Sequence, residues 1–222
     1  MASHRILVAD DHEVVRQGLR VLLEAQPGWQ VCGEAITGRE AVQKVKELKP
    51  DLVVLDITMP DLNGLEALRQ ILKIAPRTQV LVLTVHESDE VVSRVLAAGA
   101  RGYLLKSDAG RDLVAAVEAL SQRKSFFTPR VAERVLEGYL KGNGKDQKQA
   151  GSPAAVDDSL TQREREVVQL LAEGRSTKDV ATQLSISIHT AVTHRANIMR
   201  KLKIHSVSDL VRYAIRNNLA SL

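Results

Sequence analysis

The sequence predicts an α/β fold for the first part of the chain and a small all-α domain for the last part. Three observations lead to this prediction. Short β-rich runs alternate with helical stretches up to residue 124, a polar segment follows, and only helical spacing is present from residue 159 onward. Strands that alternate with helices are typical of a doubly wound parallel sheet with helices on both faces.

The predicted sheet has five strands. Their sequences are RILVA (5–9), QVCGEA (30–35), LVVLD (52–56), QVLVLT (79–84) and RGYLL (101–105). Between and after them, apolar residues recur every three or four positions, as in Val15, Leu19 and Leu22, which indicates five helices. Right-handed crossovers between parallel strands leave few topologies. Because the strands are parallel, all five are expected to end at one edge of the sheet.

The remainder of the chain contains a linker and a helical domain. Thr128 and Pro129 are typical of a helix start, and a helix is expected over 128–142. The polar stretch 142–158 cannot bury enough apolar surface to fold alone, which predicts a flexible linker. Four short helices are then expected at about 161–173, 177–184, 188–202 and 207–217. The predicted domains are therefore 1–124, 125–158 (linker helix and flexible linker) and 159–222.

The excess positive charge lies entirely in the last of these segments. Residues 159–222 carry ten Lys/Arg and five Asp/Glu, whereas residues 1–124 carry 16 and 17, and residues 125–158 carry five of each. A basic segment beside two nearly neutral ones indicates a polyanionic partner for the C-terminal part only.

The composition is that of a cytoplasmic globular protein. The 222 residues suffice for two domains, and the hydrophobic content of 44% is ordinary. No apolar run approaches the roughly 20 residues of a membrane helix, and Asp10 and Asp11 interrupt the N-terminal run before it reaches signal-peptide length. Cys32 is the single cysteine, which excludes an intrachain disulfide and suits a reducing cytoplasm.

Five polar side chains fall at the carboxyl ends of the predicted strands. Asp10 and Asp11 follow the first strand, Asp56 ends the third, Thr84 ends the fourth and Lys106 follows the fifth. Three carboxylates at one edge would repel one another unless they shared a divalent cation, and oxygen ligands favour Mg2+. A hydroxyl and an ammonium at the same edge suit the remaining oxygens of a phosphoryl group, so the pattern indicates an aspartate that accepts phosphate.

With these motifs, residues 1–124 resemble the flavodoxin-like receiver domain of two-component response regulators. The matching stretches are ILVADDH, LDITMPDLNG, LT and GYLLK. The resemblance implies that Asp11 binds Mg2+ directly, Asp10 acts largely through water, and Thr58 contributes its backbone carbonyl. Asp56 would then be both a metal ligand and the phospho-acceptor, with a histidine kinase as the phosphoryl donor.

The same resemblance assigns the switch residues. Thr84 and Lys106 would hold the phosphoryl oxygens, and Tyr103 would be a rotameric switch that turns inward after phosphorylation. Taken singly, these residues have simpler interpretations: Asp11 as a helix N-cap, Lys106 as a solvated lysine and Thr84 as a residue favoured in strands. Their joint placement at one edge favours the functional interpretation.

The stretch STKDVATQLSISIHTAVTHRANIMRKL (176–202) has the pattern of a helix, a tight turn and a second amphipathic helix. Such an arrangement enters the major groove of DNA. Ala191, Ile198 and Leu202 are expected to face inward on the second helix. The candidate DNA-contacting residues are His189, Val192, Thr193, His194, Arg195, Ala196, Asn197, Arg200, Lys201 and Lys203.

Residues 160–202 also resemble the LuxR/NarL-type (NarL/FixJ family) helix-turn-helix, which implies double-stranded DNA as the partner. Val192 and Ala196 depart from the basic or polar residues that many members carry there. Specificity would then depend on Thr193, Asn197 and thymine-methyl contacts. A helical protein-interaction module is the alternative for 159–222.

The last predicted helix carries an apolar stripe, and part of it must pack on its own domain. We expect the remainder to form a homodimer contact on DNA, because two-fold half-sites need paired readers. The candidate dimer residues are Val207, Leu210, Val211 and Ala214.

These features together predict a phosphorylation-controlled transcription regulator that is not an enzyme, beyond assisting its own Mg2+-dependent phosphotransfer and dephosphorylation. Two alternatives remain at this point. One is an aspartyl-phosphate phosphohydrolase, although Thr58 occupies the position two residues after Asp56 where such an enzyme needs a second carboxylate. The other is a receiver whose output domain binds protein or RNA.

Overall fold

The computed structural model describes residues 4–85, 88–129, 131–133, 160–204, 206–217 and 219–220. The chain divides into two compact units: the first comprises residues 1–59 and 64–156, and the second comprises residues 60–63 and 157–222.

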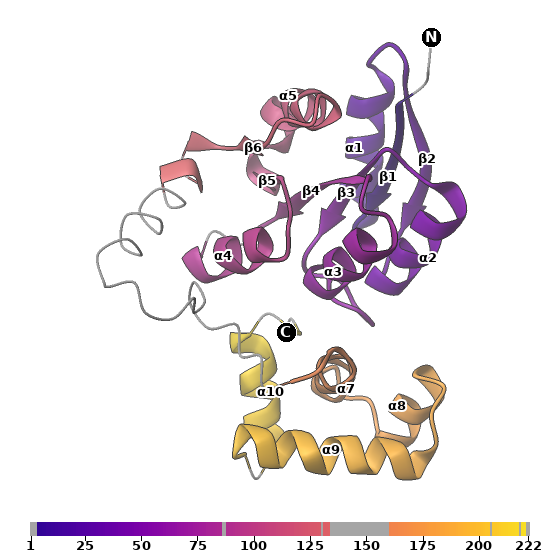
Figure 1. Ribbon diagram of the computed structural model, residues 1–222, viewed down its shortest axis with the longest axis vertical. Helices are drawn as coiled ribbons and strands as arrows, with labels where there is room; N and C mark the ends of the chain where they lie inside the picture. The colour runs from indigo at the N-terminus through magenta and orange to yellow at the C-terminus, as the bar shows by residue number, and fades with distance from the viewer. Residues whose placement is uncertain are drawn as a thin grey trace. The chain divides into compact units, whose positions relative to one another are not determined.

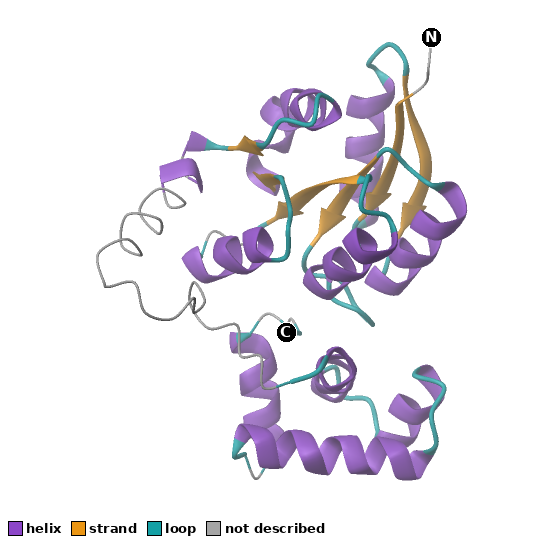
Figure 2. Ribbon diagram, viewed as in Figure 1, coloured by secondary structure: helices purple, strands orange, loops and turns teal. Residues whose placement is uncertain are grey.

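The N-terminal unit is built on a parallel sheet. Its described strands are β1 (His4–Ala9), β2 (Trp29–Ala35), β3 (Leu52–Asp56), β4 (Gln79–Thr84), β5 (Gly102–Leu105) and β6 (Phe126–Phe127). They lie in the order β2-β1-β3-β4-β5-β6, and every pair is parallel (Figures 1 and 2). The central strand β3 is buried along its whole length, which explains its uninterrupted apolar sequence.

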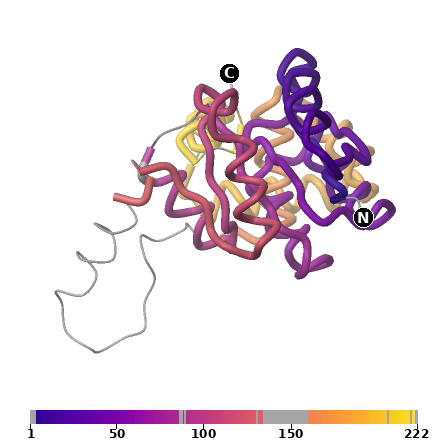
Figure 3. Tube along the Cα trace, turned by 90° about the horizontal axis from the view of Figure 1, so that it is seen from above, coloured from indigo at the N-terminus to yellow at the C-terminus, as the bar shows by residue number. Residues whose placement is uncertain are grey.

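Helices cover both faces of this sheet. The helices are α1 (Glu13–Glu24), α2 (Gly38–Leu48), α3 (Gly64–Ile74), α4 (Asp89–Ala97) and α5 (Ala109–Ser121), and a short 3-10 helix η1 (Lys106–Asp108) precedes α5. Helices α1 and α5 lie side by side on one face, and α2, α3 and α4 lie on the other (Figures 1 and 3). Apolar residues of β1, β3, β4, β5, α1 and α5 form a common core, which includes Ile6, Val54, Leu81 and Leu104.

The five predicted strands are all present, with bounds that differ by at most one residue from those expected. The prediction of a five-stranded sheet is incomplete, because β6 adds a sixth strand of two residues beside β5. A two-residue strand is too short to produce an alternating pattern in the sequence.

The C-terminal unit contains the four predicted helices. They are α7 (Gln162–Ala172), α8 (Thr177–Gln183), α9 (Ile188–Leu202) and α10 (Val207–Arg216). Their shared core is aliphatic and includes Leu170, Val180, Ala191 and Leu210. Capping boxes begin α7 at Thr161 and α8 at Ser176, and the side chains of Ser187 and Ser206 cap α9 and α10.

Part of the predicted linker region lies outside the described residues. Pro129 and residues 131–133 are helical, whereas the rest of the helix expected over 128–142 and the linker expected over 142–158 are not described. In the described part of the chain, no helix has the length and apolarity needed to cross a membrane.

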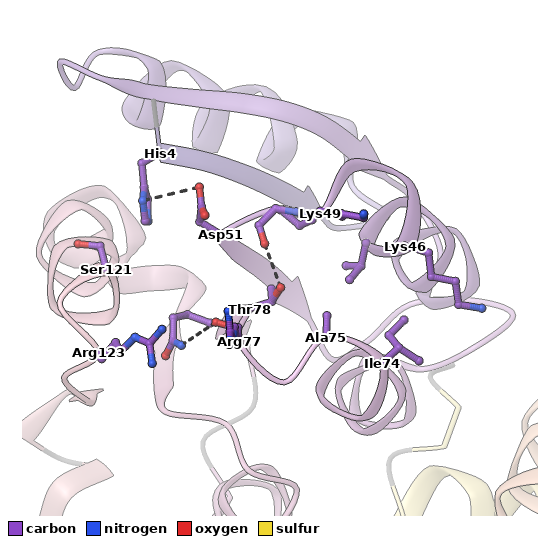
Figure 4. A pocket seen from close by; sticks show the side chains of 13 residues that line it. His4, Lys46, Lys49, Asp51, Ile74, Ala75, Arg77, Thr78, Ser121 and Arg123 are labelled. Atoms are coloured by element: carbon purple, nitrogen blue, oxygen red, sulfur yellow. Dashed lines mark hydrogen bonds and ion pairs between the residues drawn. The ribbon is translucent and has the colours of Figure 1, made fainter. Parts of the chain in front are cut away.

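A cavity of about 660 Å3 lies at the edge of the sheet where the strands begin (Figure 4). Its lining includes His4 and Asp51, whose side chains approach to 4.0 Å, and Thr78, which donates a hydrogen bond to the Pro50 carbonyl. None of the predicted site residues lines it. The chemistry predicted from the sequence belongs to the opposite edge, where the strands end.

Candidate functional site

The strand register brings the predicted site residues to one edge of the sheet. Ala9 of β1 lies opposite Leu55 of β3, so the residues that follow them, Asp10 and Asp56, are neighbours. On the other side of β3, Asp56 lies opposite Leu83 of β4. Thr84 in turn lies opposite Leu105, and Lys106 comes next along the chain. The expected convergence of four strand ends is therefore confirmed.

Four side chains at this edge form a compact group of potential metal ligands. One ligand atom each from Asp10, Asp11, His12 and Asp56 lies within 4.8 Å of the others. Asp10 and Asp56 are almost fully buried, and the Asp11 side chain is 32% exposed. His12 is the member that the sequence analysis did not include.

The Lys106 ammonium lies between the two buried carboxylates. Its Nζ donates a 2.8 Å hydrogen bond to Asp56 Oδ2 and lies 2.6 Å from Asp10 Oδ2. The other oxygen of Asp56 accepts a 3.1 Å hydrogen bond from the backbone N–H of Thr58. The other oxygen of Asp10 accepts a 2.9 Å hydrogen bond from the backbone N–H of His12. Both buried carboxylates are thus fixed in orientation.

The environment of this edge raises the pKa values of Asp56 and Lys106. Burial raises the pKa of the Asp56 carboxyl, the Lys106 ammonium opposes the rise, and the charge of Asp10 adds to it. Burial acts to lower the pKa of Lys106, but its hydrogen bonds and charge interactions with Asp10 and Asp56 outweigh burial and raise it. A site with more buried negative charge than its lysine compensates favours a further cation.

Thr84 and Tyr103 are both completely buried. Thr84 ends β4 at the same edge as the carboxylates. Tyr103 lies within β5, opposite Val82 of β4 and Phe127 of β6. The inward position predicted for the Tyr103 ring after phosphorylation is therefore the position that this structure already has.

The loop after Asp56 requires glycine at its far end. Gly64 begins α3, and its backbone N–H donates a 2.8 Å hydrogen bond to the Ile57 carbonyl. A Cβ at Gly64 would lie 1.8 Å from the Asp56 carbonyl oxygen. The helix can approach the end of β3 this closely only because residue 64 has no side chain.

Arg16 of α1 supports the acidic edge, and the sequence analysis missed this residue. It donates a 2.9 Å hydrogen bond to the backbone carbonyl of Asp10, and its Nε lies 3.2 Å from a Glu34 carboxylate oxygen. Glu34 also accepts a 2.7 Å hydrogen bond from Arg20. The only signal in the sequence is charge of opposite sign, and charge alone does not show which residues pair.

In the C-terminal unit, α8, a four-residue turn and α9 form a helix-turn-helix. Val180, Ala181 and Leu184 are buried, and the Ile186 N–H donates a 2.9 Å hydrogen bond to the Ala181 carbonyl. Arg163 of α7 donates a hydrogen bond to the Leu184 carbonyl, which holds the turn against the core.

Most of the candidate DNA-contacting residues on α9 are exposed, but His194, Arg195 and Asn197 are half-buried. His189, Thr193, Ala196 and Arg200 are exposed, whereas Ala191, Ile198 and Leu202 are buried or half-buried. Val192 is 50% exposed, beside Ile188, which is 53% exposed. These two apolar side chains are one helical turn apart, so they form a small apolar patch on the exposed side of α9.

The cationic candidates on and after α9 differ in their surroundings. Lys201 Nζ donates a 2.7 Å hydrogen bond to the Glu164 carboxylate, which also belongs to the capping box of α7. Arg200 donates a 3.0 Å hydrogen bond to Asn197 on the same helix, and Lys203 is exposed. The Lys201 contact joins α9 to α7, so this lysine has a structural role in the unit.

The predicted dimer stripe on α10 is divided between core and surface. Leu210 and Ala214 are buried in the core of the unit, whereas Val207 is 48% exposed and Val211 is half-buried. Leu210 and Ala214 cannot reach a second copy without opening that core, so the expectation that they form a dimer contact needs correction. Val207 and Val211 remain as candidates.

Comparison with protein families agrees with both halves of this arrangement. Residues 6–118 match the response regulator receiver domain, and residues 158–214 match the luxR family of bacterial regulatory proteins. The chain belongs to the response regulators with a LuxR-type output domain. It is a phosphorylation-controlled, DNA-binding transcription regulator with an acidic phosphorylation-site pocket, and not a classical enzyme.

Similar regulators match this one over nearly their full length. The transcriptional regulatory protein LiaR of Bacillus subtilis is 37% identical over 217 residues, which cover 98% of this chain and 99% of LiaR. The response regulator VraR of Staphylococcus aureus is 38% identical over 215 residues, 97% of this chain and 98% of VraR. Among solved structures, RcsB of Salmonella enterica serovar Typhimurium, bound to a promoter with the phosphomimetic BeF3−, aligns with a TM-score of 0.58 and 26% identity over 95% of this chain and 98% of RcsB.

Proposed function

We propose that Asp56 accepts a phosphoryl group from a partner histidine kinase and that this modification controls DNA binding by the C-terminal unit. The observation that supports this most directly is the position of the Asp56 carboxylate. It lies at the sheet edge within hydrogen-bonding distance of Lys106, and its neighbours are Asp10 and the buried hydroxyl of Thr84.

The donor set at this edge fits Mg2+. Carboxylate and carbonyl oxygens are the ligands that this ion prefers, and the acidic group supplies several within one small volume. Asp11, Asp56 and the backbone carbonyl of Thr58 would hold the ion, and Asp10 would act through water. When bound, the ion neutralises charge that develops on the transferring phosphoryl group.

The residues of the chain then have distinct tasks in phosphotransfer. An Asp56 oxygen attacks phosphorus while the bond from phosphorus to the kinase histidine breaks. The Lys106 ammonium, which already lies between two carboxylates, balances the added negative charge, and the Thr84 hydroxyl donates to a phosphoryl oxygen. Tyr103 stays inward in the phosphorylated form and fills the space beside Thr84. The new group adds close to two negative charges at pH 7.

The output of the switch is the exposed face of α9. His189, Val192, Thr193, His194, Ala196 and Asn197 would contact base edges, and Arg195, Arg200, Lys201 and Lys203 would contact phosphates. Two copies would pair through Val207 and Val211 on half-sites of promoter DNA. The related regulator RcsB has been solved as dimers bound to DNA.

The domain limits remain those predicted from the sequence. We place the receiver at 1–124, the linker helix and linker at 125–158 and the DNA-binding domain at 159–222. The partners proposed here, a histidine kinase domain and promoter DNA, place the regulator in the cytoplasm.

The experiment that tests this proposal measures DNA affinity in four states: wild type and Asp56→Ala, each with and without acetyl phosphate. The probe is a duplex selected by the wild-type protein from a random pool. We expect acetyl phosphate to tighten DNA binding by the wild type and to leave the affinity of Asp56→Ala unchanged. Asp51→Ala, which changes an exposed aspartate at the opposite edge of the sheet, serves as the matched control and should respond like the wild type. Equal affinities in all four states would refute phosphorylation control.

A further inference from the structure

His12 stands beside the acidic group in a way that the proposed function does not use. Its Nδ1 lies 2.9 Å from Asp11 Oδ1 and 3.3 Å from Asp10 Oδ1. The imidazole is 64% exposed, so its other edge faces solvent. The backbone N–H of His12 is bound to Asp10, which holds the start of α1 and the base of this side chain in place.

The most accessible ligand atoms of the group are those of Asp11 and His12. One oxygen of Asp10 accepts a hydrogen bond from the His12 backbone N–H, and the other pairs with the Lys106 ammonium. The oxygens of Asp56 accept hydrogen bonds from the Thr58 backbone N–H and from Lys106. About a third of the Asp11 side chain is exposed to solvent. An incoming cation therefore meets Asp11 and His12 first.

The separation of these two atoms is that of neighbouring ligands on one ion. Octahedral ligands that lie about 2.1 Å from a small divalent cation are about 3.0 Å apart when adjacent. The distances from His12 Nδ1 to Asp11 and Asp10 are 2.9 and 3.3 Å. A cation placed among these oxygens thus finds the imidazole nitrogen at ligand distance with little movement of the side chain.

We propose that His12 supplies a nitrogen ligand to the cation site, which gives the site a preference for late first-row divalent cations over Mg2+. This inference rests on the proposed function, because it concerns the same site. Imidazole nitrogen binds ions such as Co2+, Ni2+ and Fe2+ well, whereas Mg2+ prefers oxygen and keeps its waters. With the imidazole added to its oxygen ligands, the site accordingly holds a transition ion through one bond more than it holds Mg2+.

The alternative arrangement keeps the imidazole outside the coordination sphere. In that case His12 only donates a hydrogen bond to Asp11 or Asp10, and it supports every divalent cation equally. The two arrangements differ in one measurable quantity, the ratio of Co2+ to Mg2+ affinity. They also differ in whether an imidazole is bonded to the metal.

The test uses the untagged full-length chain and two probes, Co2+ and Mg2+, titrated calorimetrically into the wild type, His12→Gln and His4→Gln. His4 lies at the start of β1, at the opposite edge of the sheet, and serves as the matched histidine control. We expect His12→Gln to lower the Co2+ affinity by at least about tenfold, since loss of a metal ligand costs no less than the 10- to 100-fold that loss of an outer-sphere partner costs. The Mg2+ affinity should change by less than about threefold, because the glutamine amide keeps an N–H donor beside the carboxylates. His4→Gln should keep the wild-type ratio.

Proton NMR of the Co2+-loaded protein tests directly whether the His12 imidazole is bonded to the ion. The wild type and His4→Gln should show a strongly paramagnetically shifted, carbon-bound imidazole proton resonance that His12→Gln lacks. An unchanged Co2+ to Mg2+ ratio in His12→Gln, or a wild-type spectrum without that resonance, overturns the proposal.

The failure of this inference is distinguishable from the failure of the proposed function. Asp11→Asn should weaken both ions, because Asp11 belongs to the site whether or not His12 does. If Asp11→Asn weakens both ions and His12→Gln leaves the ratio unchanged, the proposed function stands and only the role of His12 is wrong. If Asp11→Asn weakens neither ion, the cation site itself is misplaced, and the proposal for His12 fails with it.

Discussion

Substituting Gly64 by alanine should damage the phosphorylation site without touching any charged group. Gly64 begins α3, and its missing side chain lets the helix lie against the backbone of Asp56. An alanine Cβ would lie 1.8 Å from the Asp56 carbonyl oxygen, whereas ordinary contacts begin at 3.4 Å. The helix start and the loop after Asp56 must therefore separate by about 1.6 Å, the difference between these two distances.

This displacement has consequences for both stability and phosphotransfer. Forcing extra atoms into a packed region costs about 1–3 kcal/mol, and each kcal/mol lowers the unfolding temperature of a chain of this size by roughly 2–4 °C. A displacement on the order of 1 Å also costs about 100-fold in rate when it misplaces a reacting group. We expect Gly64→Ala to unfold several degrees lower and to accept phosphate from acetyl phosphate about 100-fold more slowly.

The assay follows unfolding by the fluorescence of Trp29, the single tryptophan, which reports on the N-terminal unit. Phosphorylation is followed by the mobility of the phosphoprotein on a phosphate-affinity gel. Gly18→Ala is the matched control, because Gly18 lies within α1 and has no atom within 4 Å of the added Cβ. That control should gain about 0.5–1 kcal/mol and keep the wild-type rate. Gly64→Ala with the stability and rate of Gly18→Ala would refute the steric argument.

Three further predictions concern charge, metal and pairing. Because burial raises the pKa of Asp56 in the folded state, ionisation of Asp56 costs stability as the pH rises from its unfolded pKa of about 4 through the folded pKa. Asp56→Asn should therefore unfold at the same temperature as the wild type at pH 3.5 and at a higher temperature at pH 7. A difference in unfolding temperature that stays constant from pH 3.5 to pH 7 would contradict the raised pKa of Asp56. Mg2+ should stabilise the wild type by about 1.4 kcal/mol for each tenfold excess over its dissociation constant, and Asp11→Asn should remove this effect in the same unfolding assay. Val211→Asp should abolish cooperative DNA binding in gel-shift titrations while the helical circular dichroism signal is kept, whereas full cooperativity would exclude α10 as the pairing surface.

The grouping of Asp10, Asp56 and Lys106 at the edge of the sheet where the strands end was predictable from the sequence, because it follows from the topology. Once the strands are parallel, their carboxyl ends share an edge, and the residues just beyond those ends must be neighbours. The parallel topology therefore suffices to predict that these three residues lie close together. The register adds only that Asp10 and Asp56 are adjacent, with Lys106 between them in space.

Contacts that depend on side-chain direction were not predictable. His12 follows Asp11 in sequence, but the sequence does not show that the imidazole turns back toward the carboxylates. Glu164 and Lys201 are 37 positions apart and pair across two helices. Such pairs form from helix packing, which the periodic pattern of a single helix does not determine.

The division of α10 shows a related limit. An apolar stripe predicts that a helix is buried along one face, but it does not distinguish burial in the same domain from burial against a second copy. The structure assigns Leu210 and Ala214 to the core of the C-terminal unit. Only Val207 and Val211 keep surface that a partner would use.

The most direct test of the account is Mg2+-dependent labelling of the full-length chain with acetyl phosphate, with the modified residue located by peptide mass spectrometry after borohydride reduction of the acyl phosphate. The account predicts one label, on Asp56, that is lost when Mg2+ is chelated and absent from Asp56→Asn. Labelling that persists in Asp56→Asn, or that proceeds equally well without a divalent cation, would contradict it.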